Sequence, residues 1–166
     1  ERSMQTVNLM RALLTRQVAE DDEAIVLESL LMTLEALISY RRRYRASLNM
    51  RDVLELTLID ISNPRSVLYQ LEKLELHIAD LPAPAGASRE LEAEQRTVLE
   101  ALSMVKLSNL TSLSEVDEKS DTRKSLDQLF ARVNYLLSET SDKISDKFFD
   151  HTEGPQQLVT QKWGLE

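Results

Sequence analysis

The chain has 166 residues, 42% of them hydrophobic and 29% charged, with a formal net charge of -8. That length suits one domain with a real core, and the acidic balance argues against a nucleic-acid-binding protein, which would present a basic stripe. Zero cysteines exclude disulfides, thiolate catalysis and cysteine-ligated zinc. Since no apolar run approaches the ~20 residues of a membrane span, we expect a cytoplasmic protein without a membrane partner.

Apolar residues recur at helical spacing along most of the chain, which contains only 3 Gly and 4 Pro. The pattern predicts an all-α fold: a single bundle of about six helices, in one domain over residues 1–166, with a long C-terminal helix. The first helix is expected over 2–18. No capping residue precedes Glu1, so we expect a fragment that lacks its N-terminal part.

The second predicted helix, over 23–45, ends in an arginine-rich segment. At about 100° per residue, Arg41 and Arg45 fall on its apolar stripe, Arg42 falls at the edge and Arg43 points away. Guanidinium groups keep their charge inside a protein and need anionic partners there. The pattern therefore indicates either a structural salt-bridge cluster or a ligand-binding one.

A third helix is expected over 50–61, with Asn49 as its N-cap. Asp60 lies near the end of that helix, where a carboxylate opposes the dipole, so we expect it to pair with the arginines of the second helix. Asn63 is the expected N-cap of a fourth helix. The amides there, reinforced by Arg65, could bind an anion, although an ordinary capped helix is the simpler interpretation.

Residues 82–87 are rich in Pro and Ala and predict an internal linker. A fifth helix is expected over 89–106, and a polar, Ser-rich loop over 109–119. The last helix starts near residue 121, and its apolar stripe continues for about seven turns.

Sequence motifs for cofactor or metal chemistry are absent. The chain has no Walker loop, no Gly-x-Gly-x-x-Gly and no Gly-x-Ser-x-Gly. A ferritin-like di-iron site needs two Glu-x-x-His pairs, and this chain has none among its two histidines. We expect no metal, no cofactor and no assigned catalytic residue. An enzyme with Glu1 and Asp60 as acid–base groups is the alternative.

Three stretches together resemble the bacterial alpha-E family of helical domains, which is named for a conserved Glu-Arg pair. They are residues 1–3 (ERS), 40–44 (YRRRY) and 56–72, which includes LTLID and NPRSV. The tail over 146–158 is also similar. The sequence departs from the family at Asn8, where members often carry arginine.

The resemblance implies a domain that occurs alone or fused behind a circularly permuted ATP-grasp ligase, with peptidase genes nearby. We therefore expect a non-catalytic accessory domain of a peptide-ligase system, with an ATP-grasp-type ligase or a peptidase as partner. An enzyme of amide-bond formation or hydrolysis, and a purely structural or homo-oligomerising module, are the alternatives. The expected anion-binding site or buried ion network comprises Glu1, Arg2, Arg41, Arg42, Arg45, Asp60, Asn63 and Arg65.

Overall fold

The computed structural model describes residues 1–45, 47–82 and 90–149, and within these ranges it contains helices and no strand. The elements are α1 (Arg2–Leu14), α2 (Glu20–Thr33), α3 (Leu37–Tyr44), α4 (Met50–Leu54), the π-helix η1 (Glu55–Ile59), α5 (Val67–Ala79), α6 (Ala93–Lys106), α7 (Leu110–Ser114) and α8 (Lys124–Phe148). The predicted all-α fold and long C-terminal helix are confirmed. The structure has more than about six helices because it divides two of the predicted helices and adds a short one, α7, in a predicted loop.

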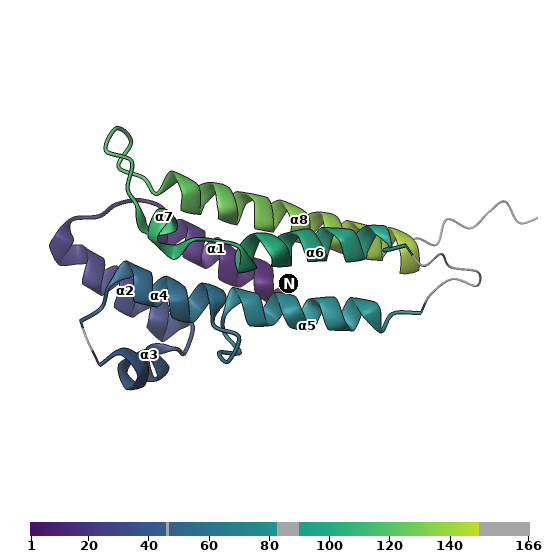
Figure 1. Cartoon of the computed structure of the whole chain (residues 1–166), viewed down its shortest axis with the longest axis horizontal. Helices are drawn as coiled ribbons and strands as arrows, with labels where there is room; N and C mark the ends of the chain where they lie inside the picture. The colour runs from purple at the N-terminus through teal and green to yellow at the C-terminus, as the bar shows by residue number, and fades with distance from the viewer. Residues whose placement is uncertain (46, 83–89, 150–166) are drawn as a thin grey trace, which may run out of the picture.

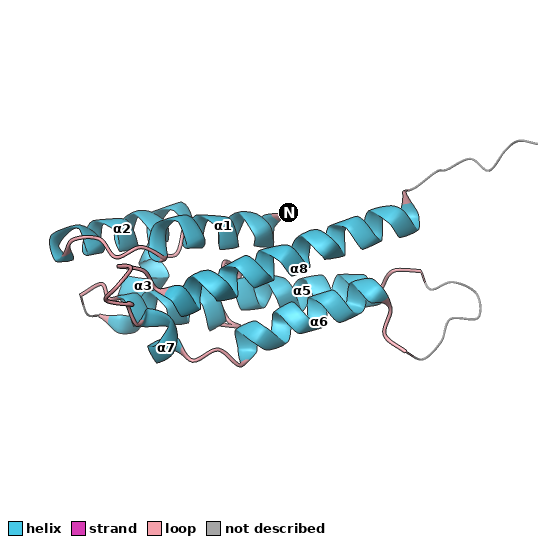
Figure 2. Ribbon diagram, turned by 90° about the horizontal axis from the view of Figure 1, so that it is seen from above, coloured by secondary structure: helices cyan, strands magenta, loops and turns pink. Residues whose placement is uncertain are grey.

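The long helix α8 organises the bundle. It packs along α6 on one side and α1 on the other, and α5 contacts both α6 and α1 (Figure 1). Seen from above, α8 lies between α1 and α6 (Figure 2). Its buried stripe follows the predicted helical spacing and consists of Leu126, Leu129, Phe130, Val133, Leu136, Leu137 and Thr140. Each large apolar side chain of this kind contributes about 1.5–3 kcal/mol on burial.

The start of α4 follows the prediction and the start of α5 does not. Asn49 caps α4 by accepting a hydrogen bond from the Asp52 amide at 2.9 Å, as predicted. The cap of α5 is Ser66, whose hydroxyl accepts from the Tyr69 amide at 3.1 Å. The prediction that Asn63 is this cap is wrong, because the loop after η1 runs through residues 60–65 and α5 begins only at Val67.

The predicted second helix ends early, in a Schellman motif. The amide of Glu35 donates to the Met32 carbonyl at 3.0 Å, and the amide of Ala36 donates to the Leu31 carbonyl at 2.7 Å. Glu35 has φ 54°, the left-handed conformation that this motif requires and that glycine normally supplies. Because the turn ends α2, α3 begins on a new axis.

Several predicted helix boundaries were also wrong. The first helix ends at Leu14 instead of near residue 18. The third is interrupted by η1, and the last begins at Lys124. The linker over 82–87 lies, apart from Pro82, outside the described residues, as does most of the tail over 146–158. Within the described ranges, no helix combines the length and the apolar character that crossing a bilayer requires.

Candidate functional site

The arginines at the end of α3 lie on the surface. Arg41, Arg42 and Arg45 are all exposed, and Arg41 pairs with Glu28 at 2.7 Å while 68% of its side chain stays accessible. Tyr40 is the buried residue of α3, and Leu37 and Tyr44 pack against the core beside it. The expectation that Arg41 and Arg45 face inward is wrong, because the helical register was continued through the break at Glu35.

Asp60 pairs with an arginine of α3, but the partner is Arg43, which was expected to point away from the apolar stripe. Arg43 donates to Asp60 at 2.5 Å and to Glu55 at 3.1 Å. Burial acts to raise the pKa of Asp60, but hydrogen bonds from Ser62 and the charge of Arg43 outweigh it, and the pKa lies below its ordinary value. A carboxylate held in its charged form is poorly suited to general acid catalysis.

Asn63 has a structural role in the loop between η1 and α5. Its buried side chain donates to the Leu56 carbonyl at 2.8 Å and accepts from the Arg65 amide at 3.0 Å. These bonds fix the backbone of Arg65 at the start of α5.

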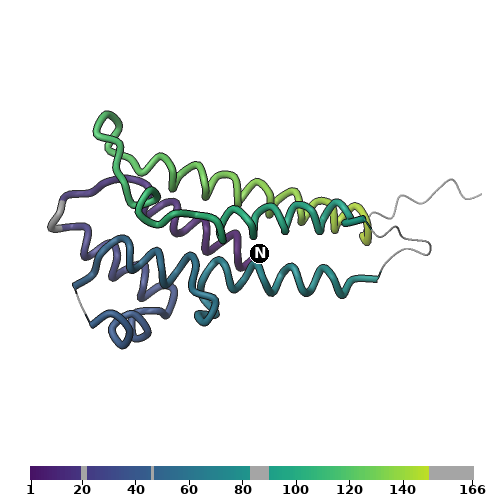
Figure 3. Tube along the Cα trace, viewed as in Figure 1, coloured from purple at the N-terminus to yellow at the C-terminus, as the bar shows by residue number. Residues whose placement is uncertain are grey.

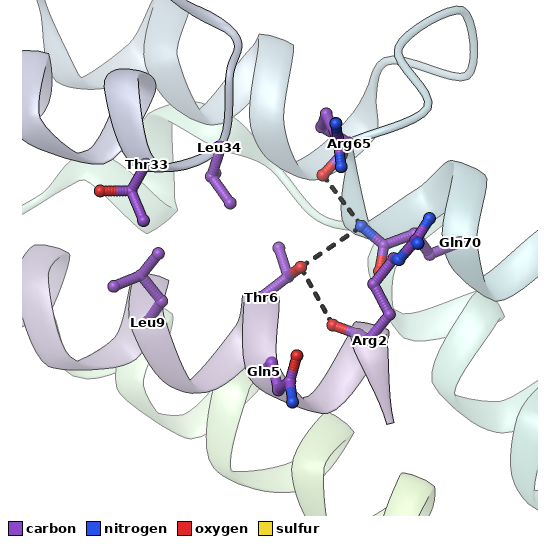
Figure 4. Close-up of a pocket in the computed structure, with 8 residues that line it drawn as sticks. All are labelled: Arg2, Gln5, Thr6, Leu9, Thr33, Leu34, Arg65 and Gln70. Carbon is purple, nitrogen blue, oxygen red and sulfur yellow. Dashed lines mark hydrogen bonds between the residues drawn. The ribbon is translucent and has the colours of Figure 1, made fainter.

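A pocket opens where the N-terminal end of α1 meets the start of α5, and Figure 3 shows these two segments side by side. It has a volume of about 260 Å³, and we call it the first chamber (Figure 4). Its walls come from α1, the end of α2 and the start of α5. The lining residues are Arg2, Gln5, Thr6, Leu9, Thr33, Leu34, Arg65 and Gln70.

Gln70 is the polar centre of this wall. Its Nε2 donates to Thr6 Oγ1 at 3.3 Å and to the Arg65 carbonyl at 3.0 Å (Figure 4). Thr6 Oγ1 in turn donates to the Arg2 carbonyl at 3.1 Å. Gln70 is 8% exposed, and its Oε1 is buried without a hydrogen-bond donor among the described residues. An unpaired buried carbonyl costs about 1–3 kcal/mol.

Two guanidinium groups share the first chamber, and no acidic residue lines it. Arg65 pairs with the exposed Glu35, a contact worth only about 0–1 kcal/mol in water. Within the described part of the chain, Arg2 has no ion pair. An anion that enters the chamber would therefore meet Arg2, which forms no ion pair among the described residues, and Arg65, whose salt bridge with Glu35 is weak.

A second chamber, of about 390 Å³, shares Arg2 and Gln70 with the first, and we call the two together the α1–α5 cleft. Its wall continues along α5 past Lys73 to His77, and Glu1 and Tyr69 also line it. Glu1 accepts a hydrogen bond from Gln5 at 3.3 Å.

The structure thus divides the predicted site residues. Arg2, Arg65 and Glu1 line the α1–α5 cleft, whereas the arginines of α3 lie on another surface. Thr6 and Gln70 were not among the predicted site residues, although each is a polar residue on a buried helical stripe.

Comparison with known proteins points to one family. A family model described as a predicted alpha-helical domain with a conserved ER motif, named Alpha-E, matches residues 1–149. Uncharacterised proteins of Mycobacterium bovis and of two strains of Mycobacterium tuberculosis are each 32% identical to the chain over 164 residues. These matches cover 99% of the chain but 18% of each relative, so the chain spans about a fifth of their length. No solved structure matches it significantly.

The Glu-Arg motif connects the family to the cleft. Glu1-Arg2 is the only Glu-Arg dipeptide in the sequence, and both of its residues line the second chamber. With the family model covering residues 1–149, the chain belongs to the alpha-E family of helical domains.

Proposed function

We propose that this domain is a non-catalytic accessory domain of a cytoplasmic peptide-ligase system associated with ATP-grasp enzymes, and that it binds an anionic group of substrate or partner in the α1–α5 cleft. The observation that carries the binding role is the position of Arg2. It belongs to the Glu-Arg pair, lines both chambers and has no ion pair among the described residues. The ligase association is supported by the resemblance described for residues 1–3, 40–44 and 56–72.

The choice of an accessory role over an enzyme follows from the two carboxylates that an enzyme would use. Asp60 is committed to Arg43 and Ser62, and its pKa is lowered. Glu1 is exposed, at the start of α1. A general acid is usually a buried carboxyl group whose pKa is raised, whereas Asp60 is held in its charged form and Glu1 is not buried.

The salt bridge between Arg65 and Glu35 makes a two-directional test possible. Glu35→Gln frees Arg65 and should tighten anion binding, whereas Arg2→Gln and Arg65→Gln should weaken it. Loss of a charge-assisted hydrogen bond predicts about a tenfold weaker affinity for each arginine variant. Titration of the ¹⁵N-labelled chain with inorganic phosphate, and separately with N-acetylglutamate, measures the affinity from amide shifts.

Arg51→Gln is the matched control, because Arg51 is an exposed arginine on α4, away from the cleft residues. It should leave both affinities unchanged. If Arg2→Gln binds as the parent does, or if the shifted amides lie outside α1 and α5, the cleft is not an anion site.

The partner is tested separately, by calorimetry of the chain against a circularly permuted ATP-grasp ligase encoded beside an alpha-E domain. We expect measurable association. Its absence would overturn the accessory role and leave the anion-binding result intact.

A further inference from the structure

The α1–α5 cleft carries positive charge at two separate positions. Arg2 and Arg65 line the first chamber, and Lys73 lines the second. The ammonium of Lys73 lies 5.5 Å from the centre of the Tyr69 ring, which holds it against α5 without an acidic partner in the described part of the chain. His77 adds a hydrogen-bonding imidazole one turn further on.

Between the two positions lies an acceptor that lacks a donor. The amide orientation of Gln70 is fixed, because its Nε2 donates to the Arg65 carbonyl, which can only accept. Its Oε1 is therefore the free end of a side chain that lines both chambers. This oxygen is buried, so a ligand pairs with it only by displacing the side chains that cover it, and the ligand must then bring an N–H or O–H group as well as negative charge.

These requirements discriminate between anion classes. A polyphosphate chain supplies charge but few donors, whereas a peptide supplies a backbone N–H beside each acidic side chain. The length also fits a peptide. From Gln70 to His77 the helix rises about 10.5 Å, which an extended peptide of three or four residues covers at about 3.3 Å per residue.

We infer that the cleft binds an acidic peptide segment of about three residues. One carboxylate lies between Arg2 and Arg65, a second reaches Lys73, and a backbone N–H faces Gln70 Oε1. This inference rests on the proposed anion site and adds to it the identity of the ligand class.

Capped peptides test it directly. N-acetyl-triglutamate amide should bind the chain about tenfold more tightly than the same peptide with one Glu and two Gln, because only the first supplies a second ion pair. Lys73→Gln should abolish that difference, so that the two peptides bind the variant with equal affinity. Lys119→Gln, which changes an exposed lysine in a distant loop, should preserve the difference.

Two further probes separate the peptide from other anions. A triglutamate peptide with N-methylated amides keeps its charge but loses its donors, and it should bind about tenfold more weakly. Inorganic tripolyphosphate should bind more weakly than triglutamate. Equal affinity for the one-Glu and three-Glu peptides, no effect of N-methylation, or a preference for tripolyphosphate would each overturn the peptide assignment. Retained binding of N-acetylglutamate through Arg2 would show that the simpler anion site stands without it.

Discussion

Arg123 is a buried charge that joins distant parts of the chain. With 5% of its side chain accessible, it donates to the carbonyl oxygens of Leu14 at 3.0 Å and Arg16 at 3.3 Å, and it pairs with Glu23 at 2.5 Å. It thereby ties the end of α1 and the start of α2 to the first turn of α8. Because these partners come from three segments, the residue belongs to the tertiary structure and cannot be assigned from local periodicity.

Removing this guanidinium should be costly. Arg123→Met leaves two carbonyl groups and a partly buried carboxylate without their donor, and we expect the free energy of unfolding to fall by about 2–4 kcal/mol. Urea denaturation followed by circular dichroism measures it. Arg132→Met, which breaks an exposed pair with Glu100, should change it by no more than about 1 kcal/mol. If the free energy of unfolding fell by similar amounts in the two variants, Arg123 would contribute no more to stability than an exposed arginine does.

The break between α2 and α3 is the element that decides where the arginines lie. Glu35 occupies the left-handed position of the Schellman motif, at a cost of about 1 kcal/mol for a residue with a Cβ atom. Glu35→Gly and Glu35→Ala both remove the pair with Arg65, so their difference reports the backbone alone. We expect the glycine variant to be more stable than the alanine variant by about 1 kcal/mol in thermal unfolding. A more stable alanine variant would contradict the motif.

The same break shows what the sequence could and could not predict. Helix periodicity was sufficient to predict the presence of α1, α5, α6 and α8, although not all of their ends, because the buried side chains of each helix follow an unbroken stripe. It failed after Glu35, where a residue other than glycine or asparagine takes the left-handed position and no sequence pattern marks the helix end. The cleft escaped prediction for a different reason. It depends on α1 packing beside α5, whose facing residues Thr6 and Gln70 are 64 positions apart.

At the scale of the whole molecule, the two least accessible carboxylates among the ion pairs of the described residues both lie at tertiary contacts. Glu94 of α6, 5% accessible in its side chain, accepts from Lys147 of α8 at 2.6 Å, as Asp60 accepts from Arg43. Burial acts to raise the pKa of Glu94, but the hydrogen bond and charge of Lys147 prevail and the pKa is lowered below its ordinary value of 4.5. Both carboxylates must therefore stay ionised for the bundle to keep these contacts.

The pH dependence of stability follows from these shifts. A lowered pKa in the folded state means that the unfolded chain binds protons first as pH falls, so the contribution is complete above the ordinary values of 4.5 for Glu94 and 3.8 for Asp60. It is then lost as pH falls through the folded pKa values.

We expect the free energy of unfolding to drop between about pH 5 and about pH 3. Glu94→Gln should be less stable than the parent near neutrality, but its free energy of unfolding should fall less over that pH interval. Urea titrations at each pH measure both slopes, and Glu100→Gln, at an exposed pair, should retain the parent slope. If Glu94→Gln and the parent lost stability equally, the Glu94–Lys147 contact would not be a source of acid sensitivity.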